Sequence, residues 1–405
     1  MNFKKNSELP LFISADLERG TGQHFKGATS FVYNMGIGES NNLDNAFKVG
    51  KITAEECSQI GINMIYSPVL DINNNYRNPI INIRSYSDKP DIVIDMSEAF
   101  INGVYSYGVL PVGKHFPGHG NTDKDSHLEL PILKKKFKSI EKLELLPYKK
   151  LIEKNLLKAI MVGHISIPDI EEDNKIIPAT LSKNVIEYLR KNLKFEGLLI
   201  TDALNMSALS SFENNIFTEI LKSGLDILLM PKNPILALEQ IFSNKNDKEL
   251  LENINISFER LQRFKKDFAF KPKKNVNYIN SIKNQKFSEK LAYDSLKILK
   301  SNIKFPLDYK KSKIINLIID LDNNEYNWLD YKNELLKYDI ETYLLDINNN
   351  YNNYDFIIIS FFSKILAWKK NIFPDNKTIK FLEELNNKKN TIYINFFKSL
   401  SYKKG

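Results

Sequence analysis

The sequence predicts an α/β fold in which parallel strands form a sheet buried on both faces. The first observation is a pattern in the first 230 residues, where apolar runs of strand length alternate with stretches of helical apolar spacing. The second is that these runs are apolar at almost every position, as expected of strands covered on both faces by crossover helices. The third is that most of the runs end at a polar residue, which places chemistry at one edge of the sheet.

Six apolar runs carry this pattern, at residues 11–15, 63–70, 109–113, 159–163, 197–201 and 226–230. The first five end at Asp16, Asp71, Lys114 with His115, His164 and Asp202, and the sixth ends at Pro231. Helices are expected at 42–59, at 90–107 and, behind a possible N-cap at Ser182, at 182–192. The alternation of strand and helix is what a parallel sheet requires, because parallel neighbours need a crossover connection.

Two architectures would bring these strand ends together. In a (β/α)8 barrel they converge on the active site around a ring. In a doubly wound open sheet they line a crevice at a single switch point. No Gly-x-Gly-x-x-Gly motif opens a helix after the first strand, which counts against a dinucleotide-binding fold. The expected fold is a TIM-type barrel, of which only six of the eight strands are visible in the sequence.

The rest of the chain predicts a second, smaller α/β domain. We expect a barrel with trailing helices at 1–267, a linker at 268–290 and a partial α/β sandwich domain at 291–405. The helices are expected at 235–267, 287–300, 326–336 and 378–385, and the strands of the second domain at 314–319, 356–360 and 391–395.

Composition excludes several classes of protein. The chain of 405 residues has a formal charge of +8, but its lysines form no stripe with interleaved aromatic residues, so nucleic acid is not an expected partner. No apolar run is long enough to span a membrane, and no secretory signal is visible at the N-terminus. The single cysteine, Cys57, fits a reducing compartment. We expect a cytoplasmic protein, or a periplasmic one if a longer N-terminus carries a signal, and the sequence does not fix its oligomeric state.

The segment from Lys114 to His127 is the richest in chemistry. It holds three histidines, two aspartates and two lysines within fourteen positions, directly after an apolar run. Charged groups at this density are costly to bury unless they are paired. The segment therefore predicts a strand that runs into an active-site loop.

Three reaction types could use these residues. A metal-assisted hydrolysis could recruit His115, His119, His127 and His164, but a Pro-Gly pair separates His115 from His119, so the two cannot share a helix face. Lys114 could serve as a Schiff-base nucleophile, but this would leave His115 and Asp202 without clear roles. Both are disfavoured, and no metal or cofactor is expected.

Glycoside hydrolysis is the reaction that gives a role to most of these residues. A retaining glycosidase needs a nucleophile and a separate group that protonates the leaving oxygen. Asp202 at a strand end can be the nucleophile, although it could equally be the N-cap of a helix starting near Ala203. His127 can be the acid, oriented by Asp125 two residues away, although these residues could also form a solvated Asx-type turn.

The Lys114–His127 segment and three other segments resemble those of a known family. Lys114-His115-Phe116-Pro117-Gly118-His119-Gly120, four residues and then Asp125-Ser126-His127 is similar to the signature of glycoside hydrolase family 3, in its β-N-acetylglucosaminidase branch. The segment 198–206 with Asp202 resembles the nucleophile strand of that family, 78–86 with Arg84 its arginine-bearing loop, and 11–22 with Asp16 and Glu18 its early substrate-binding strand. The resemblance covers most of residues 9–240.

The resemblance implies a role for each of these residues. Asp202 would form the glycosyl-enzyme, and His127, paired with Asp125, would be the general acid and then the general base. The residues implied to hold and orient the sugar are Asp16, Arg84, Lys114, His115 and His164. The Asp-Ser-His loop favours N-acetylhexosaminides, often muropeptide fragments from peptidoglycan turnover in this family. Measured against relatives, the barrel is expected to lack its first two βα units and the second domain to be incomplete.

Two alternatives follow from the same resemblance. One is a β-glucosidase or other exo-glycosidase of the same family, and water or phosphate could be the acceptor. The other is a decayed relative that binds sugar without catalysis. Intact Asp202, Asp125, His127 and Arg84 favour an active enzyme.

Overall fold

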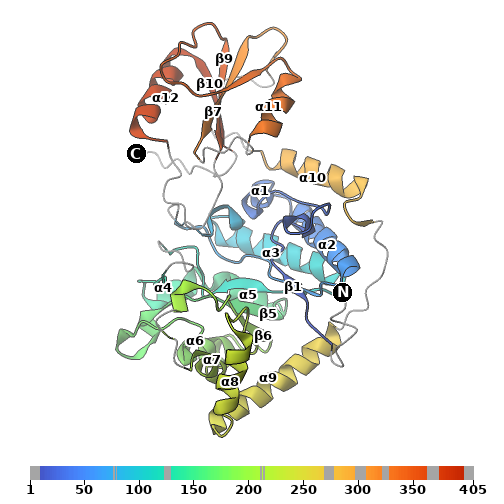
Figure 1. Cartoon of the computed structure of the whole chain (residues 1–405), viewed down its shortest axis with the longest axis vertical. Coiled ribbons are helices and arrows are strands. Elements are labelled where there is room, and N and C mark those ends of the chain that lie inside the picture. The colour runs from blue at the N-terminus through green and yellow to red at the C-terminus, as the bar shows by residue number, and fades with distance from the viewer. Residues whose placement is uncertain are drawn as a thin grey trace. The chain divides into compact units, whose positions relative to one another are not determined.

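The computed structural model describes residues 10–75, 78, 80–122, 129–209, 212, 215–268, 278–296, 307–321, 328–362 and 374–395. The chain divides into two compact units, Met1–Leu296 and Lys297–Gly405, which are described separately. Both units have α/β architecture with parallel strands, as the sequence predicts (Figure 1).

The first unit is built on short parallel strands in two three-stranded sheets, ordered β1-β2-β3 and β4-β5-β6. The strands are β1 (Ser14–Ala15), β2 (Met64–Ile65), β3 (Leu110–Pro111), β4 (Gly113–Phe116), β5 (Ala159–Val162) and β6 (Leu198–Thr201). β3 and β4 are almost continuous, and a parallel bridge from Val69 to Lys114 links the two sheets. Among the residues that the structure describes, the strands do not close into a barrel.

Four of the expected strands differ from the structure. Those expected at 11–15 and 63–70 are reduced to the two-residue strands β1 and β2. The strand expected to stop at Gly113 continues through Lys114 and His115 as β4, because Val69 and β5 both supply neighbours for it. The sixth expected strand is reduced to a single parallel bridge between Ile200 and Ile227. The described residues give this segment backbone hydrogen bonds with β6 and with Leu204 just beyond it, but too few for a regular strand.

Crossover helices separate these strands. They are α1 (Asn34–Glu39), α2 (Leu43–Ile60), α3 (Pro90–Tyr105), α4 (Phe137–Lys142), α5 (Leu146–Glu153), α6 (Lys183–Glu187) with a following π turn (Tyr188–Asn192), and α7 (Ile216–Lys222). Their ends follow local rules: the Asn42 side chain caps α2, Gly61 ends it with φ of 86°, and the Ser182 side chain caps α6. The three helices expected here from the sequence are confirmed, with α6 and the π turn sharing the third.

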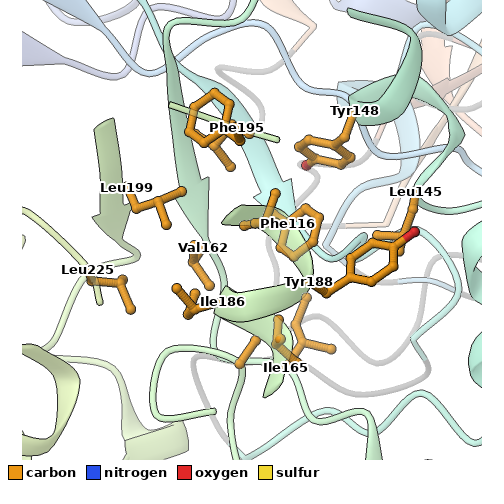
Figure 2. Packing of buried hydrophobic residues seen from close by; sticks show 14 of the residues in the cluster. Phe116, Leu145, Tyr148, Val162, Ile165, Ile186, Tyr188, Phe195, Leu199 and Leu225 are labelled. Carbon is orange, nitrogen blue, oxygen red and sulfur yellow. The ribbon is translucent and has the colours of Figure 1, made fainter. Parts of the chain in front are cut away.

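The helices cover one face of the β4-β5-β6 sheet. Ile160, Val162 and Leu199 point into a core formed with α3, α5, α6 and α7. Figure 2 shows the ring of Phe116, the last residue of β4, close to Tyr148 of α5, with centroids 5.1 Å apart in an edge-on contact. This packing anchors the strand that carries Lys114 and His115.

The opposite face of the sheet packs against the other sheet and against one helix outside the alternating pattern. Met161, Leu198 and Ile200 point away from the crossover helices and share a core with Met64 and Leu110 of the other sheet and with Phe264. Phe264 belongs to α9 (Lys248–Asp267), which follows α8 (Pro234–Ser243). Both faces of the sheet are therefore apolar and covered, as its strand sequences predict.

Helix α10 (Ile282–Asp294) lies partly within the stretch 268–290 that the sequence predicts to be a linker. Its Leu291 is fully buried in a core of the first unit, and Phe287 meets Phe31 edge-on at 5.8 Å. Glu56 of α2 accepts a hydrogen bond from the backbone of Asn280, which holds the start of this segment. The first compact unit accordingly extends to Leu296.

The second unit has a four-stranded parallel sheet in the order β10-β9-β7-β8. Its elements are β7 (Ile314–Asp320), α11 (Leu329–Leu336), β8 (Glu341–Leu344), β9 (Phe356–Phe362), α12 (Asn376–Lys388) and β10 (Asn390–Asn395). The three strands expected here are confirmed, and β8 is an edge strand that the sequence pattern does not predict. No helix in the described part of the chain is both long enough and apolar enough to cross a membrane.

Candidate active site

The polar residues that follow the strands gather at the carboxyl edge shared by the first unit's two sheets. Parallel strands bring their carboxyl ends to the same edge, so side chains distant in sequence meet there. Lys114, for example, lies 98 residues from Asp16 in sequence, yet its Nζ donates to Asp16 Oδ1 at 2.6 Å. Four of the residues implied to hold the sugar, Asp16, Arg84, Lys114 and His115, belong to one hydrogen-bonded network.

Lys114 is the buried cation of this network. Its side chain is 2% exposed, and its Nζ lies 2.6 Å from Asp16 Oδ1 and 2.7 Å from Glu18 Oε1. Burial acts to lower the pKa of Lys114, but the carboxylates of Asp16 and Glu18 outweigh it, so the pKa is raised. An ammonium held between two carboxylates is protonated and cannot act as a Schiff-base nucleophile, which argues against that alternative.

Arg84 is fixed by a two-pronged ion pair with Glu18. Nε donates to Oε2 at 2.9 Å and Nη2 to Oε1 at 2.7 Å, and the backbone of Arg84 lies in a short 3-10 turn, η2 (Asn82–Arg84). Burial acts to raise the pKa of Glu18, yet Arg84 and Lys114 hold it well below its ordinary range. Glu18 Oε1 thus accepts from both cations, so this single carboxylate determines the spacing between them.

His115 lies between Arg84 and a fully buried carboxylate, Asp71. Arg84 Nη2 is 3.3 Å from His115 Nε2, and His115 Nδ1 is 2.7 Å from Asp71 Oδ2. A guanidinium has only donors, so Nε2 must accept and the imidazole proton must lie on Nδ1. Burial acts to raise the pKa of Asp71, but His115, together with the backbone N–H of His119, lowers it.

The turn after β4 is held by a second set of hydrogen bonds. Asp71 Oδ1 accepts from the His119 N–H at 2.6 Å, and His119 Nδ1 is 2.6 Å from Thr122 Oγ1. Asn78 donates to the carbonyls of both His119 and Thr122, at 2.7 and 3.0 Å. Gly120 approaches the Ile72 carbonyl so closely that a Cβ would lie 1.7 Å from its oxygen, so only glycine fits there. Burial lowers the pKa of His119 to about 4, so this imidazole is neutral at pH 7.

Asp202 directly follows β6 and is half-buried. Its backbone N–H donates to Val162 O at 2.8 Å, and its Oδ1 accepts from the Ala203 N–H at 2.8 Å. No helix begins at Ala203, so the expectation of an N-cap at this position is wrong; the chain forms a turn before the short 3-10 segment Ser207–Leu209. The carboxylate is therefore held by its own turn and not used to cap a helix.

The electrostatic surroundings of Asp202 favour its charged form. Burial acts to raise its pKa, but the positive charges that His115 and His164 carry when protonated oppose this effect. The Ala203 N–H and the Lys114 ammonium add to them, and the pKa of Asp202 is lowered below its ordinary value. Asp202 is thus an ionised carboxylate close to the same cations and imidazoles that form the network.

His164, which follows β5, is fully buried. Its Nε2 lies 3.2 Å from the Ala203 carbonyl oxygen, which can only accept, and its Nδ1 lies 3.0 Å from Thr180 Oγ1. This places the His164 ring beside the turn that carries Asp202.

Two of the expected catalytic residues, Asp125 and His127, lie outside the described residues, which stop at Thr122 and resume at Glu129. Conversely, the structure brings into the site Asp71, which the sequence marks only as the end of an apolar run, and Glu18, which it marks only as part of the segment resembling a substrate-binding strand. Asp71 ends an apolar run just as Asp202 does, and Glu18 follows Asp16 by two positions, so both signals were present in the sequence. Across the part of the chain that the structure describes, no three His, Cys, Asp or Glu side chains gather in a way that could hold a metal ion.

Parallel strands with acidic, basic and imidazole groups at their carboxyl edge are typical of α/β enzymes. Comparison with known proteins identifies the class: the sequence profile described as Glycosyl hydrolase family 3 N terminal domain matches residues 2–264. The chain belongs to glycosyl hydrolase family 3.

Individual relatives point the same way. Beta-hexosaminidase A of Pseudoalteromonas piscicida is 36% identical over 244 residues, which is 56% of this chain, and the chain spans 41% of that curated relative's length. Among solved structures, a family 3 β-N-acetylglucosaminidase from Paenibacillus sp. str. FPU-7 is similar with a TM-score of 0.79 and 26% identity, over 96% of this chain and 77% of that one. A β-glucoside phosphorylase, BglX, is similar in fold with a TM-score of 0.88 at 24% identity, over 99% of this chain and 82% of that one.

Proposed function

We propose that the protein is a retaining exo-β-N-acetylhexosaminidase that removes terminal N-acetylglucosamine through a covalent intermediate on Asp202. The observation that carries this proposal is the ionised Asp202 carboxylate at the carboxyl edge of the sheet, beside His115, His164 and Lys114. A nucleophile in a retaining glycosidase must be unprotonated when the sugar binds. The lowered pKa of Asp202 meets this requirement.

The network beside Asp202 is suited to hold sugar hydroxyls. The side chain of Asp16 is 52% exposed and presents carboxylate oxygens, which can accept hydrogen bonds from hydroxyl groups. Arg84 is 22% exposed, while Glu18 and Lys114 behind it are almost fully buried. Hydrogen bonds between charged groups and hydroxyls are stronger than neutral ones, so a rigid, paired network can orient the sugar ring. In this proposal Asp16, Arg84, Lys114, His115 and His164 contact or surround the sugar.

The proposed reaction has two steps. Asp202 attacks the anomeric carbon as the bond to the leaving oxygen breaks, and His127 gives that oxygen its proton. His127 then takes a proton from water, whose oxygen attacks the anomeric carbon and releases the Asp202 carboxylate. Asp125 orients the imidazole of His127. The roles of Asp125 and His127 rest on their spacing after the Lys114–Gly120 motif.

The substrate class rests on the same loop and on the relatives. The Asp125-Ser126-His127 sequence resembles that of the N-acetylglucosaminidase branch, and the similar proteins include ones named β-hexosaminidase and β-N-acetylglucosaminidase. We propose fragments derived from peptidoglycan as the natural substrate and the cytoplasm as the site of action. We also propose that the first unit corresponds to a TIM-type barrel, followed by an α/β sandwich domain.

The test is turnover of chromogenic glycosides by the purified chain. We expect release of the aryl group from an aryl β-N-acetylglucosaminide, and far slower release from the matching β-glucoside. Asp202→Asn keeps the size of the side chain and should abolish this turnover. If turnover survives unchanged in that variant, Asp202 is not the nucleophile.

Other outcomes identify the alternatives. Faster turnover of the β-glucoside would assign the protein to the glucosidase type. Formation of N-acetylglucosamine 1-phosphate when inorganic phosphate is added would make phosphate the acceptor in place of water. Binding of N-acetylglucosamine without turnover of any glycoside would mark a sugar-binding relative that has lost catalysis.

A further inference from the structure

The buried carboxylate of Asp71 is a charged group at the carboxyl edge that the proposed reaction does not use directly. Its side chain is completely inaccessible, and each of its oxygens is occupied. Oδ2 accepts from the His115 imidazole at 2.7 Å and from the His115 backbone N–H at 3.2 Å, and Oδ1 accepts from the His119 N–H at 2.6 Å. A carboxylate with three donors and no exposure cannot contact a substrate, so its effect must pass through the groups that it binds.

We propose that Asp71 is a positioning residue, which fixes His115 as the neutral Nδ1–H tautomer and thereby holds Arg84 and His115 in a single arrangement for sugar binding. This inference rests on the proposed function for its catalytic consequence, whereas the tautomer itself can be measured without any substrate.

The direction of the hydrogen bonds supports this assignment. Arg84 Nη2 can only donate, so His115 Nε2 must present its lone pair to it across 3.3 Å. The ring proton must then lie on Nδ1, where the Asp71 carboxylate accepts it. An imidazole protonated on Nε2 would direct an N–H at a guanidinium N–H, which is repulsive. Asp71 therefore selects one of two tautomers, in the way that a buried carboxylate orients a histidine in other enzymes.

Asp71 also connects the two strand ends that carry the network. Its backbone carbonyl accepts from Ser85 Oγ at 2.6 Å, directly beside Arg84 in the chain. Its side chain holds His115 on β4 and His119 in the following turn. A change in the Asp71 carboxylate would therefore act on His115 and on the β4 turn together, while the backbone contact with Ser85 stays in place.

Asp71→Asn is the sharpest perturbation, because it preserves shape and removes an acceptor. One terminal atom of the new amide becomes a donor, facing either the His119 N–H or the His115 Nδ1–H. If it faces His115, the imidazole must move its proton to Nε2, which opposes Arg84. We expect this variant to lower kcat/KM by about 10–100-fold, the effect typical of removing a carboxylate that orients a histidine.

The first measurement is the tautomer of His115 in the wild-type chain. Long-range ¹H–¹⁵N spectra of the imidazoles at pH 7, assigned by the signals lost in His115→Gln, should show a protonated Nδ1 and an unprotonated Nε2. An Nε2–H tautomer or a doubly protonated ring would overturn the proposal. This result does not depend on enzyme activity, or on whether Asp71→Asn folds.

The second measurement is a double-mutant cycle on kcat/KM. If Asp71 acts through His115, Asp71→Asn should cost about 10–100-fold in the wild-type background and little in the His115→Gln background. Equal costs in both backgrounds would contradict a positioning role. Asp226→Asn is the matched control, because it makes the same change at a buried aspartate away from the carboxyl edge, and it should leave both the His115 spectrum and kcat/KM unchanged.

The two proposals fail separately. If the chain turns over no glycoside, the proposed function fails, and the spectrum still decides whether Asp71 sets the tautomer. If the chain is active but His115 carries its proton on Nε2, the proposed function stands and the role of Asp71 does not.

Discussion

The carboxyl and amino edges of the first unit's parallel strands each hold buried carboxylates paired with cations, but the two networks differ in what they leave accessible. At the carboxyl edge, Glu18 and Lys114 are buried while the carboxylate of Asp16 is 52% exposed. At the amino edge, Asp226 is completely buried and its partners Arg190 and Arg260 are 18% and 16% exposed. One network presents polar groups for binding, and the other is closed.

The hydrogen bonds of Asp226 show what the closed network does. Oδ2 accepts from Arg190 at 3.0 Å and from the Leu199 N–H at 2.8 Å, while Oδ1 accepts from Arg260 at 2.5 Å and from Ser257 at 2.7 Å. Ser257 and Arg260 belong to α9, so this carboxylate ties α9 to the start of β6. The hydrogen bonds that Asp226 accepts all come from the protein itself, so this carboxylate stabilises the fold.

The comparison teaches that similar pairs of buried charges can serve different ends depending on the edge of the sheet they occupy. In α/β proteins of this kind, active-site residues lie at the carboxyl ends of the strands, and residues that stabilise the fold lie at the amino ends. If that division holds here, substitutions at the two edges should separate in their effects on unfolding and on turnover.

The largest expected effect is on stability, at the amino edge. Asp226→Ala leaves Arg190 and Arg260 facing each other without a carboxylate, and the Leu199 N–H without a side-chain acceptor. Breaking a buried pair by removing one partner costs about 3–5 kcal/mol. We expect the unfolding free energy measured in urea to fall by this amount, with kcat per folded molecule unchanged.

A matched control for this substitution is Glu187→Ala. Glu187 forms an exposed pair with Lys191, 3.0 Å apart, and such pairs contribute little. An unfolding free energy that falls no further in Asp226→Ala than in Glu187→Ala would contradict the structural role of Asp226.

The next effect is a pH dependence at the carboxyl edge. Burial lowers the pKa of His119 to about 4, below the ordinary value for histidine of 6.5. Between these values the unfolded chain binds a proton that the folded chain does not, so the unfolding free energy decreases as the pH falls from 6.5 to about 4. The contribution of this group reaches roughly 3 kcal/mol at the acid end of the window.

His119→Gln should therefore flatten the dependence of the unfolding free energy on pH in that window, relative to the wild-type chain. Chemical denaturation at several pH values between 4 and 7 measures the slope. His24→Gln removes an imidazole from an exposed position and provides the control. An unchanged slope in His119→Gln would mean that this imidazole is protonated in the folded state.

A smaller effect is expected on turnover at the carboxyl edge. Arg84→Lys keeps the positive charge but loses the two-pronged contact with Glu18 and the donor to His115. We expect kcat/KM for an aryl β-N-acetylglucosaminide to fall by about 10–100-fold, the equivalent of one charge-assisted hydrogen bond. Arg263→Lys, at an exposed arginine of α9, is the control. Equal activity in the two variants would contradict the role proposed for the Arg84 guanidinium.

The smallest expected effect concerns a helix cap that belongs to neither network. Ser182 Oγ accepts from the Val185 N–H at 3.0 Å at the start of α6, and its hydroxyl donates to Glu171. Ser182→Ala should lower the unfolding free energy by about 1 kcal/mol and leave turnover unchanged. Ser182→Thr retains the cap and should recover most of the loss; if it does not, the cap is not what stabilises this helix.

The sequence was most informative where structure depends on neighbours along the chain. The strands at 159–163 and 197–201, and the helix at 42–59 with its Asn42 cap, follow from apolar periodicity and capping, which are local properties. For the same reason the strand ends were visible as the place for chemistry. In contrast, β8 is not predicted by the sequence pattern, because only Thr342 of its four residues is buried and its strand conformation depends on pairing with β7.

The candidate site divides in the same way. The sequence alone determined which residues end the strands and, through the spacing after Lys114, the family that the chain resembles. Only the tertiary structure decided that Glu18 is shared between Lys114 and Arg84, that Asp71 holds His115, and that Asp202 belongs to a turn and not to a helix cap. The physical reason is distance along the chain: a carboxylate finds its partner dozens of residues away only when parallel strands bring their ends to one edge.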